Sequence, residues 1–276
     1  MIYTFSLLRV SNMIKKCGRG DLERILAIDS IALTVAIACI TIANISPMWV
    51  ALLVALAGCL LISYVLVCIL KTLEREKTIV SKGKTIVIRE CDIFSQSGII
   101  VIPFNRYFDT TVNNRIIADS SLNGQFISKH YSNSVSVLDK EIDRQLSGVP
   151  SEKMTRTEGK NIMYSPGTIV SVGVKEQTYV LLALTEFDSN NNAGCHLSDY
   201  AKAILDLMNY LNINSQGRDV SIPLIGGGLS RMNMAPEDLL ELLVALIKAD
   251  KHGSPNNITI CLTDKTLDKI DLSKIN

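Results

Sequence analysis

The longest uncharged stretch of the chain constrains its fold more than any other feature. No Asp, Glu, Lys or Arg occurs from Ser30 to Leu70, where Ile, Leu, Val and Ala dominate. The second half, Met48 to Leu70, would form a helix about 35 Å long, enough to cross a hydrocarbon core of roughly 30 Å. The first half, Ile31 to Ile45, is shorter and precedes a polar, proline-containing break. The stretch therefore predicts two transmembrane helices at 29–70, with a buried hairpin in a soluble core as the alternative.

Basic residues flank both ends of this stretch, whereas the turn between its halves carries no charge. The positive-inside rule then predicts a multi-pass protein of the cell membrane, with both termini and the domain that follows in the cytoplasm. Residues 1–28 form an N-terminal cytoplasmic segment, either a short interfacial helix or a tail. The flanking cations are Arg9, Lys15, Lys16, Arg19 and Arg24 before the stretch and Lys71, Arg75 and Lys77 after it.

The composition argues against two classes of function. The 276 residues carry a formal net charge of +1 and contain no basic stripe, so nucleic acid is not an expected partner. Three histidines and seven scattered cysteines without C-x-x-C spacing predict no metal site. Such free cysteines are typical of a reducing compartment, which agrees with a cytoplasmic domain.

Beyond the hydrophobic stretch, short apolar runs alternate with amphipathic helical patterns. We interpret 71–83 as a charged linker and 84–276 as one α/β domain with a mixed or parallel sheet flanked by helices. One helical face runs through 138–146, and another follows a candidate cap at Ser198. The expected strands are Ile86–Ile88, Ile99–Phe104, Thr168–Val172, Tyr179–Leu184, Val220–Ile225 and Ile258–Leu262.

The stretch IPLIGGGLSRMNMAPEDLLELLVALI, residues 222–247, runs from a strand through three glycines into a helix. Pro236 suits the first turn of that helix, and the leucines that follow recur at helical spacing. A strand, glycines and a helix in this order allow backbone N–H groups to point at an anion. The alternative is a tight turn in which glycine only permits positive φ.

Two patterns resemble catalytic motifs without meeting their requirements. Gly83-Lys84-Thr85 matches the end of a Walker A loop, but Thr78 stands where the first glycine is needed and a strand follows. Cys195 precedes His196, but neighbours in sequence usually point apart, so no thiol–imidazole pair is expected. The sequence therefore predicts no catalytic residue.

Five stretches occur in order between residues 84 and 270. Asp92-Ile93 follows the first expected strand of the domain, and Asn105 follows the second. The loop ADSSLNGQF (118–126), the turn and strand IMYSPGTIVSV (162–172), the glycine loop and the terminal ITICLTD (258–264) come next. This order resembles that of the macro domain, an α/β module that binds ADP-ribose.

The resemblance implies a site for an ADP-ribose derivative, without a cofactor. Asp92 would accept a hydrogen bond from the adenine amine with Ile93 beside it, and Asn105 would face the distal ribose. Each of these residues could instead have a purely structural role, as a helix cap or a turn former. The residues implied in the two phosphate loops are Leu122, Asn123 and Gly124 in the first, and Gly226, Gly227, Gly228, Leu229 and Ser230 in the second.

Two departures from the family pattern bear on catalysis. The first loop reads Ser120-Ser121 where relatives carry glycines, and VIPFNRYFD replaces the usual small residues before the asparagine. Hydrolytic macro domains need a loop that positions a water against the distal ribose. The departures therefore favour binding over hydrolysis, and a membrane-tethered ADP-ribosyl hydrolase is the alternative.

A macro-like domain behind a two-helix hairpin resembles the membrane effectors of type II Thoeris anti-phage systems. The resemblance implies a TIR-domain partner that makes a histidine or other amino-acid conjugate of ADP-ribose from NAD. It also implies that the chain senses this nucleotide signal, forms a homo-oligomer and disrupts the lipid of the bacterial inner membrane. A constitutive membrane-anchored scaffold, which would bind no nucleotide, is a third possibility.

Overall fold

The computed structural model describes residues 34, 55–56, 58–65, 75–187, 193–226, 232, 234–250 and 257–275. The chain divides into two units, Met1–Arg75 and Glu76–Asn276. In the first unit, residues 34, 55–56 and 58–65 are helical. Within the described residues, no helix has both the length and the apolar character needed to cross a membrane. The predicted segment 1–28 lies outside these residues, as does most of the predicted hairpin at 29–70.

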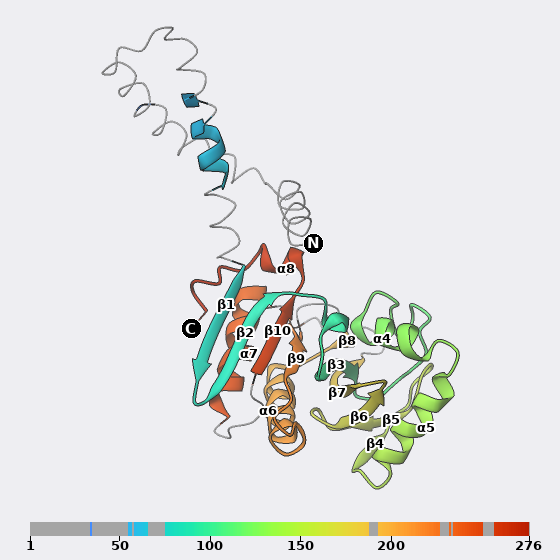
Figure 1. Ribbon diagram of the computed structural model, residues 1–276. Helices are drawn as coiled ribbons and strands as arrows, with labels where there is room; N and C mark the ends of the chain where they lie inside the picture. Colours follow the sequence, from blue (N-terminus) through green and yellow to red (C-terminus); the bar gives the residue numbers. More distant parts are fainter. Residues whose placement is uncertain are drawn as a thin grey trace, which may run out of the picture. The chain divides into compact units, whose positions relative to one another are not determined.

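The second unit is built on one mixed sheet of eight strands (Figure 1). The inner neighbours β2–β10, β10–β9, β9–β3 and β3–β7 are parallel, whereas β1 and β6 pair antiparallel at the two edges. In sheet order the strands are β1 (Glu76–Ser81), β2 (Lys84–Glu90), β10 (Asn257–Leu262), β9 (Val220–Pro223), β3 (Ile99–Asn105), β7 (Gln177–Phe187) and β6 (Ile169–Val174), with β8 (Ala193–Gly194) on β7.

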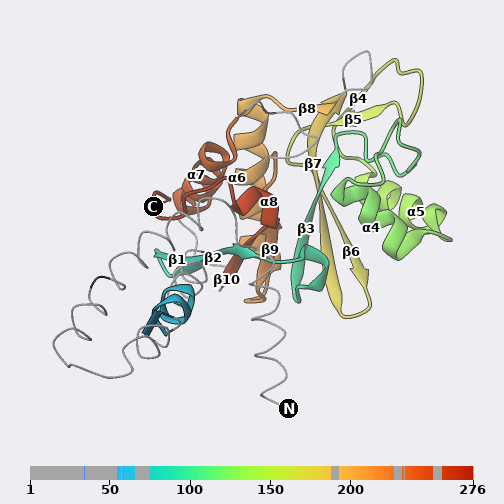
Figure 2. The ribbon, with the colours of Figure 1, turned by 90° about the horizontal axis from the view of Figure 1, so that it is seen from above.

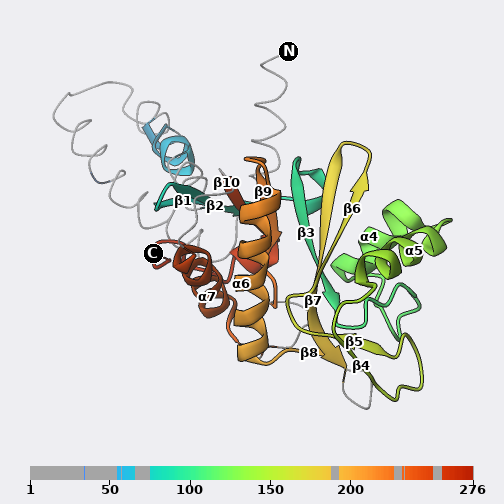
Figure 3. The same ribbon diagram turned by 90° about the horizontal axis from the view of Figure 1, so that it is seen from below.

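Helices cover both faces of this sheet (Figures 2 and 3). The helices α6 (Leu197–Asn214) and α7 (Pro236–Ala249) pack on one face, and α4 (Leu122–Tyr131) and α5 (Val135–Leu146) pack on the other. Strand β3 serves both cores, because successive side chains of a strand point to opposite faces. Ile99 and Val101 belong to the core under α6 and α7, whereas Ile100 and Ile102 belong to the core under α4 and α5.

The predicted mixed α/β sheet flanked by helices is confirmed, and all six expected strands are present. Strand β9 ends at Pro223, before the expected Ile225. Four strands were not expected: β1 within the segment interpreted as a linker, β8, and the separate pair β4 (Ser151–Lys153) and β5 (Ile162–Tyr164).

The predicted cap of α6 was wrong by two residues. The N-cap is His196, and Ser198 lies inside the first turn. The helix has already begun there, because the backbone N–H of Tyr200 donates to the carbonyl of His196 at 2.9 Å. Helix α7 begins at Pro236 as predicted, with Glu237 and Asp238 in its first turn.

Candidate functional site

The carboxyl ends of the parallel strands bring two of the predicted site residues, Asp92 and Asn105, to one edge of the sheet. Asp92 lies two residues after β2, and Asn105 is the last residue of β3. Strands β10 and β9 lie between them in the sheet and point the same way. Ligands of open α/β sheets bind at this edge, because loops rather than strands occupy it.

Asp92 combines a local structural role with an exposed carboxylate. It caps the short helix η1 (Ile93–Ser95): one carboxylate oxygen accepts from the backbone N–H of Phe94 at 3.0 Å, the other from the Ser95 hydroxyl at 2.8 Å. Each carboxylate oxygen has a second lone pair, so Asp92 can still accept from a ligand. Ile93, the next residue, is buried.

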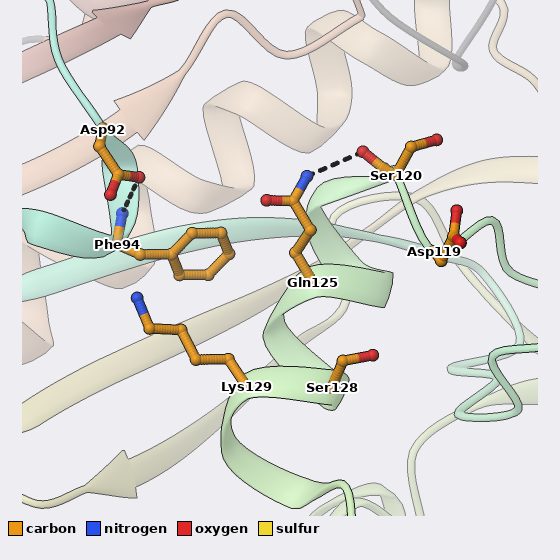
Figure 4. Close-up of a pocket in the computed structure, with 7 residues that line it drawn as sticks. All are labelled: Asp92, Phe94, Asp119, Ser120, Gln125, Ser128 and Lys129. Atoms are coloured by element: carbon orange, nitrogen blue, oxygen red, sulfur yellow. Dashed lines mark hydrogen bonds between the residues drawn. The ribbon is translucent and has the colours of Figure 1, made fainter.

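A pocket with a volume of ≈ 650 Å³ opens between η1 and α4 (Figure 4). In Figure 4, the Asp92 carboxylate points at the backbone N–H of Phe94, and the Phe94 ring faces Gln125 and Lys129 of α4. The Lys129 ammonium lies 5.0 Å from the centre of the Phe94 ring, and the Gln125 amide donates to the carbonyl of Ser120 at 2.8 Å. One aromatic face with polar groups around it suits a planar heterocycle such as a nucleobase. The lining residues are Asp92, Phe94, Asp119, Ser120, Gln125, Ser128 and Lys129.

The residues implied in the first phosphate loop are helical. Leu122, Asn123 and Gly124 form the first turn of α4, and Ser121 caps it by accepting from the backbone N–H of Gly124 at 3.1 Å. The earlier expectation of a loop there was wrong, because Ser121 is a strong N-cap residue and starts the helix directly after itself. The helix N-terminus still presents N–H groups at the edge of the sheet.

The second implied loop begins at Gly226, which adopts φ = +91°. Only glycine adopts this conformation readily, and a Cβ there would also approach the sulfur of Met232 to 2.8 Å. The remaining predicted residues, Gly227, Gly228, Leu229 and Ser230, lie outside the described residues. Their role in binding phosphate stays a prediction.

Asn105 is buried, with 2% of its surface exposed. Its side-chain oxygen accepts from the backbone N–H groups of Tyr107 at 3.0 Å and Asp109 at 3.2 Å, which fixes the turn after β3. Its amide nitrogen is buried, and no described residue accepts a hydrogen bond from it. Asn105 therefore orders the end of β3 and retains donor capacity there.

A buried ion pair beside Asn105 was not found by sequence reasoning. Arg156, between β4 and β5, donates to the carboxylate of Asp109 at 3.0 Å. The guanidinium lies 3.9 Å from the centre of the Tyr107 ring, and burial raises the pKa of Tyr107 despite this cation. No local sequence pattern connects Asp109 with a partner 47 residues away.

The cysteines near this edge have contrasting chemistry. The Cys91 and Cys261 sulfurs lie 2.7 Å apart, and their hydrogen bond lowers the pKa of Cys91 and raises that of Cys261. Burial raises the pKa of Cys195 to about 11, and its thiol contacts the carbonyl of His196 rather than the imidazole. Among the described residues, no three His, Cys, Asp or Glu side chains are grouped to hold a metal.

A mixed sheet between two helical layers, with its pocket at the carboxyl edge, is the architecture of a macro-type binding domain. The family model for the macro domain of Thoeris protein ThsA matches residues 86–263. The chain therefore belongs to the ThsA macro-domain family, which confirms the macro-domain part of the predicted resemblance.

One relative and two solved structures are similar to this chain to different degrees. The Thoeris protein ThsA of Bacillus amyloliquefaciens (strain Y2) is 32% identical over 203 residues, covering 70% of this chain and 67% of that protein. The Oceanobacillus iheyensis macrodomain with ADP has a TM-score of 0.48 at 10% identity, covering 70% of this chain and 91% of the other. The same macrodomain with MES bound has a TM-score of 0.47 at 9% identity, covering 70% and 92%.

Proposed function

We propose that this chain is a membrane-anchored sensor of an ADP-ribose-type nucleotide in anti-phage defence. One observation carries the proposal: a member of the ThsA macro-domain family has a pocket with an exposed aspartate at the carboxyl edge of its sheet. The Asp92 carboxylate accepts from the adenine amine, and the Phe94 ring offers a face for the base. The diphosphate then lies between the N-terminus of α4 and the loop that begins at Gly226.

The signal in this proposal is a histidine or other amino-acid conjugate of ADP-ribose, made from NAD by a TIR-domain partner. The hydrophobic stretch at 29–70 anchors the chain in the bacterial inner membrane as two helices. Ligand binding drives homo-oligomerisation, and the assembled hairpins disrupt the membrane. The resemblance to type II Thoeris effectors and the uncharged sequence from Ser30 to Leu70 support these steps.

Binding is favoured over turnover by the surroundings of Asn105. The bulky residues Tyr107 and Phe108 are buried beside it, where a hydrolase needs room for a positioned water. Incubation of the full-length chain with ADP-ribosylated protein separates the two functions. Stoichiometric retention without release of ADP-ribose supports the sensor, whereas multiple turnovers would favour the hydrolase.

The adenine contact is tested by Asp92→Ala. Loss of a charged acceptor is expected to weaken binding of ADP-ribose by about 1.5–3 kcal/mol, measured by titration calorimetry on the full-length chain. Asp143→Ala, which removes an exposed carboxylate of α5 outside the pocket, is the matched control and should bind as the wild type does. Unchanged affinity in the Asp92 variant would show that the base binds elsewhere.

A further inference from the structure

A buried guanidinium beside the end of β3 has one unused edge. The side chain of Arg156 is 8% exposed. Its Nη1 donates to the carboxylate of Asp109 at 3.0 Å and to the carbonyl of Lys160 at 2.5 Å. Its Nε and Nη2 atoms are buried and have no hydrogen-bond partner among the residues that the structure describes. The ion pair therefore uses one nitrogen of this group and leaves two unsatisfied.

The two unsatisfied nitrogens belong to the same side of the guanidinium. Nε–H and Nη2–H point in parallel from one edge and form the fork that binds both oxygens of a planar carboxylate. A buried donor without an acceptor costs roughly 1–3 kcal/mol and more when it is charged. An edge of this kind is therefore expected to have an acceptor in some functional state.

The described residues around this edge orient it without supplying an acceptor. Both oxygens of the Asp109 carboxylate already accept hydrogen bonds, one from Nη1 of Arg156 and the other from the backbone N–H of Lys160 at 2.6 Å. The faces of Tyr107 and Phe187, with ring centres 3.9 and 5.1 Å from the guanidinium carbon, hold its plane. The Asn105 amide, on the same turn as Asp109, adds a further buried donor without a partner. Within the part of the chain that the structure describes, three buried donor atoms beside the end of β3 have no acceptor: Nε and Nη2 of Arg156 and Nδ2 of Asn105.

We propose that the Nε/Nη2 edge of Arg156 is a subsite for a carboxylate at the distal end of the ligand. The inference rests on the proposed function, because it assigns the ligand's terminal group to that same site. Arg156 lies between β4 and β5, which pair with each other and not with the main sheet. Because the Nε/Nη2 edge is buried, binding of the carboxylate requires a local shift of this segment, whose two strands are not part of the main sheet.

The test changes the ligand as well as the protein. Titration calorimetry on the full-length chain compares ADP-ribose, its histidine conjugate and its histidinamide conjugate, which lacks only the carboxylate charge. We expect the histidine conjugate to bind about 10- to 100-fold more tightly than the histidinamide conjugate, as for a charge-assisted bidentate pair. Because the protein is wild type in this comparison, its folding is unaffected.

Arg156→Lys keeps the charge and removes the fork, so it should abolish most of this difference while ADP-ribose binds as before. Arg115→Gln is the matched control. The Arg115 side chain is 71% exposed and pairs with Glu158, which also lies between β4 and β5, so the difference in affinity between the two conjugates should persist. Equal wild-type affinity for the two conjugates would overturn the subsite and leave the proposed function intact. If Arg156→Lys weakens the binding of all three compounds equally, the subsite is also overturned. The Nε/Nη2 edge would then contact the diphosphate or stabilise the fold. Failure of the wild type to bind ADP-ribose would overturn both proposals.

Discussion

A single missing side chain shapes the wall of the pocket at Gly124. A Cβ built there would collide with the carbonyl oxygen of Ala118, which precedes the pocket residues Asp119 and Ser120. In a helix, Gly→Ala normally gains about 1 kcal/mol, whereas overpacking costs about 1–3 kcal/mol. We therefore expect Gly124→Ala to lower the free energy of unfolding by about 1–2 kcal/mol and to weaken ligand binding.

Denaturant unfolding followed by circular dichroism measures the change in unfolding free energy, and calorimetry measures the change in ligand affinity. Gly173→Ala is the control, because a Cβ at that position of β6 meets nothing within 4 Å. Its unfolding free energy should stay within about 0.5 kcal/mol of the wild type. Stabilisation by Gly124→Ala would mean that helix propensity outweighs the contact with Ala118.

Site residues that depend on local sequence could be predicted, and those that depend on distant contacts could not. Asp92 and Asn105 directly follow or end apolar strands, so their place at the sheet edge follows from the chain order. Ser121 was assigned to a loop because its neighbours are polar and small, although it caps α4. Arg156 acquires its role through Asp109 and Tyr107, which no spacing pattern connects to it.

At the scale of elements, one buried ion pair links β2, α6 and α7. Lys84, the first residue of β2, is 1% exposed, and its ammonium pairs with the carboxylate of Asp250 at the C-cap of α7. Asn212 of α6 donates to both oxygens of that carboxylate, at 3.2 and 3.1 Å. The lysine of the Walker-like Gly83-Lys84-Thr85 is therefore structural and lies at the opposite end of β2 from Asp92.

Removing one partner of this pair leaves a buried charge uncompensated. Lys84→Met is expected to lower the free energy of unfolding by about 3–5 kcal/mol, and Lys84→Met with Asp250→Asn should recover part of the loss. A double-mutant cycle in urea, followed by circular dichroism, measures the coupling. If the losses of unfolding free energy in the two single variants simply add up in the double variant, Lys84 and Asp250 do not stabilise the fold as a pair. The ligand affinity of the folded variants should not change, because the pocket lies at the carboxyl ends of the strands and Lys84 lies at the opposite end of β2.

The elements that could be predicted are those whose side chains are buried in a regular pattern. The inner strands are continuous apolar runs because both faces of a parallel sheet are covered. The missed strands lack that signal: every residue of β4 is exposed, and β1 alternates exposed and partly buried residues at the sheet edge. Their pairing with β5 and β2 is a tertiary contact that composition does not encode.

For the whole molecule, the proposed membrane activity requires assembly. The two helices proposed at 29–70 would leave no lumen between them, and Ile, Leu and Val offer no polar lining for a pore. Disruption therefore needs several hairpins side by side. A ligand can favour that state only by binding the assembled form more tightly than the free chain. In the sequence of the second predicted span, Ala51, Ala55 and Gly58 are spaced four and three apart, which favours close helix packing.

We expect ADP-ribose or its histidine conjugate to increase the crosslinked oligomer of the full-length chain in membranes. Gly58→Leu should reduce that increase, because a bulky side chain separates the packed helices. Ala57→Leu is the control, since its place in sequence puts it on a different side of the same predicted helix. The ligand affinity of both variants should match the wild type at concentrations where the chain is unassembled. If oligomer size is indifferent to a ligand that demonstrably binds, the gating model is wrong and a pre-assembled complex must replace it.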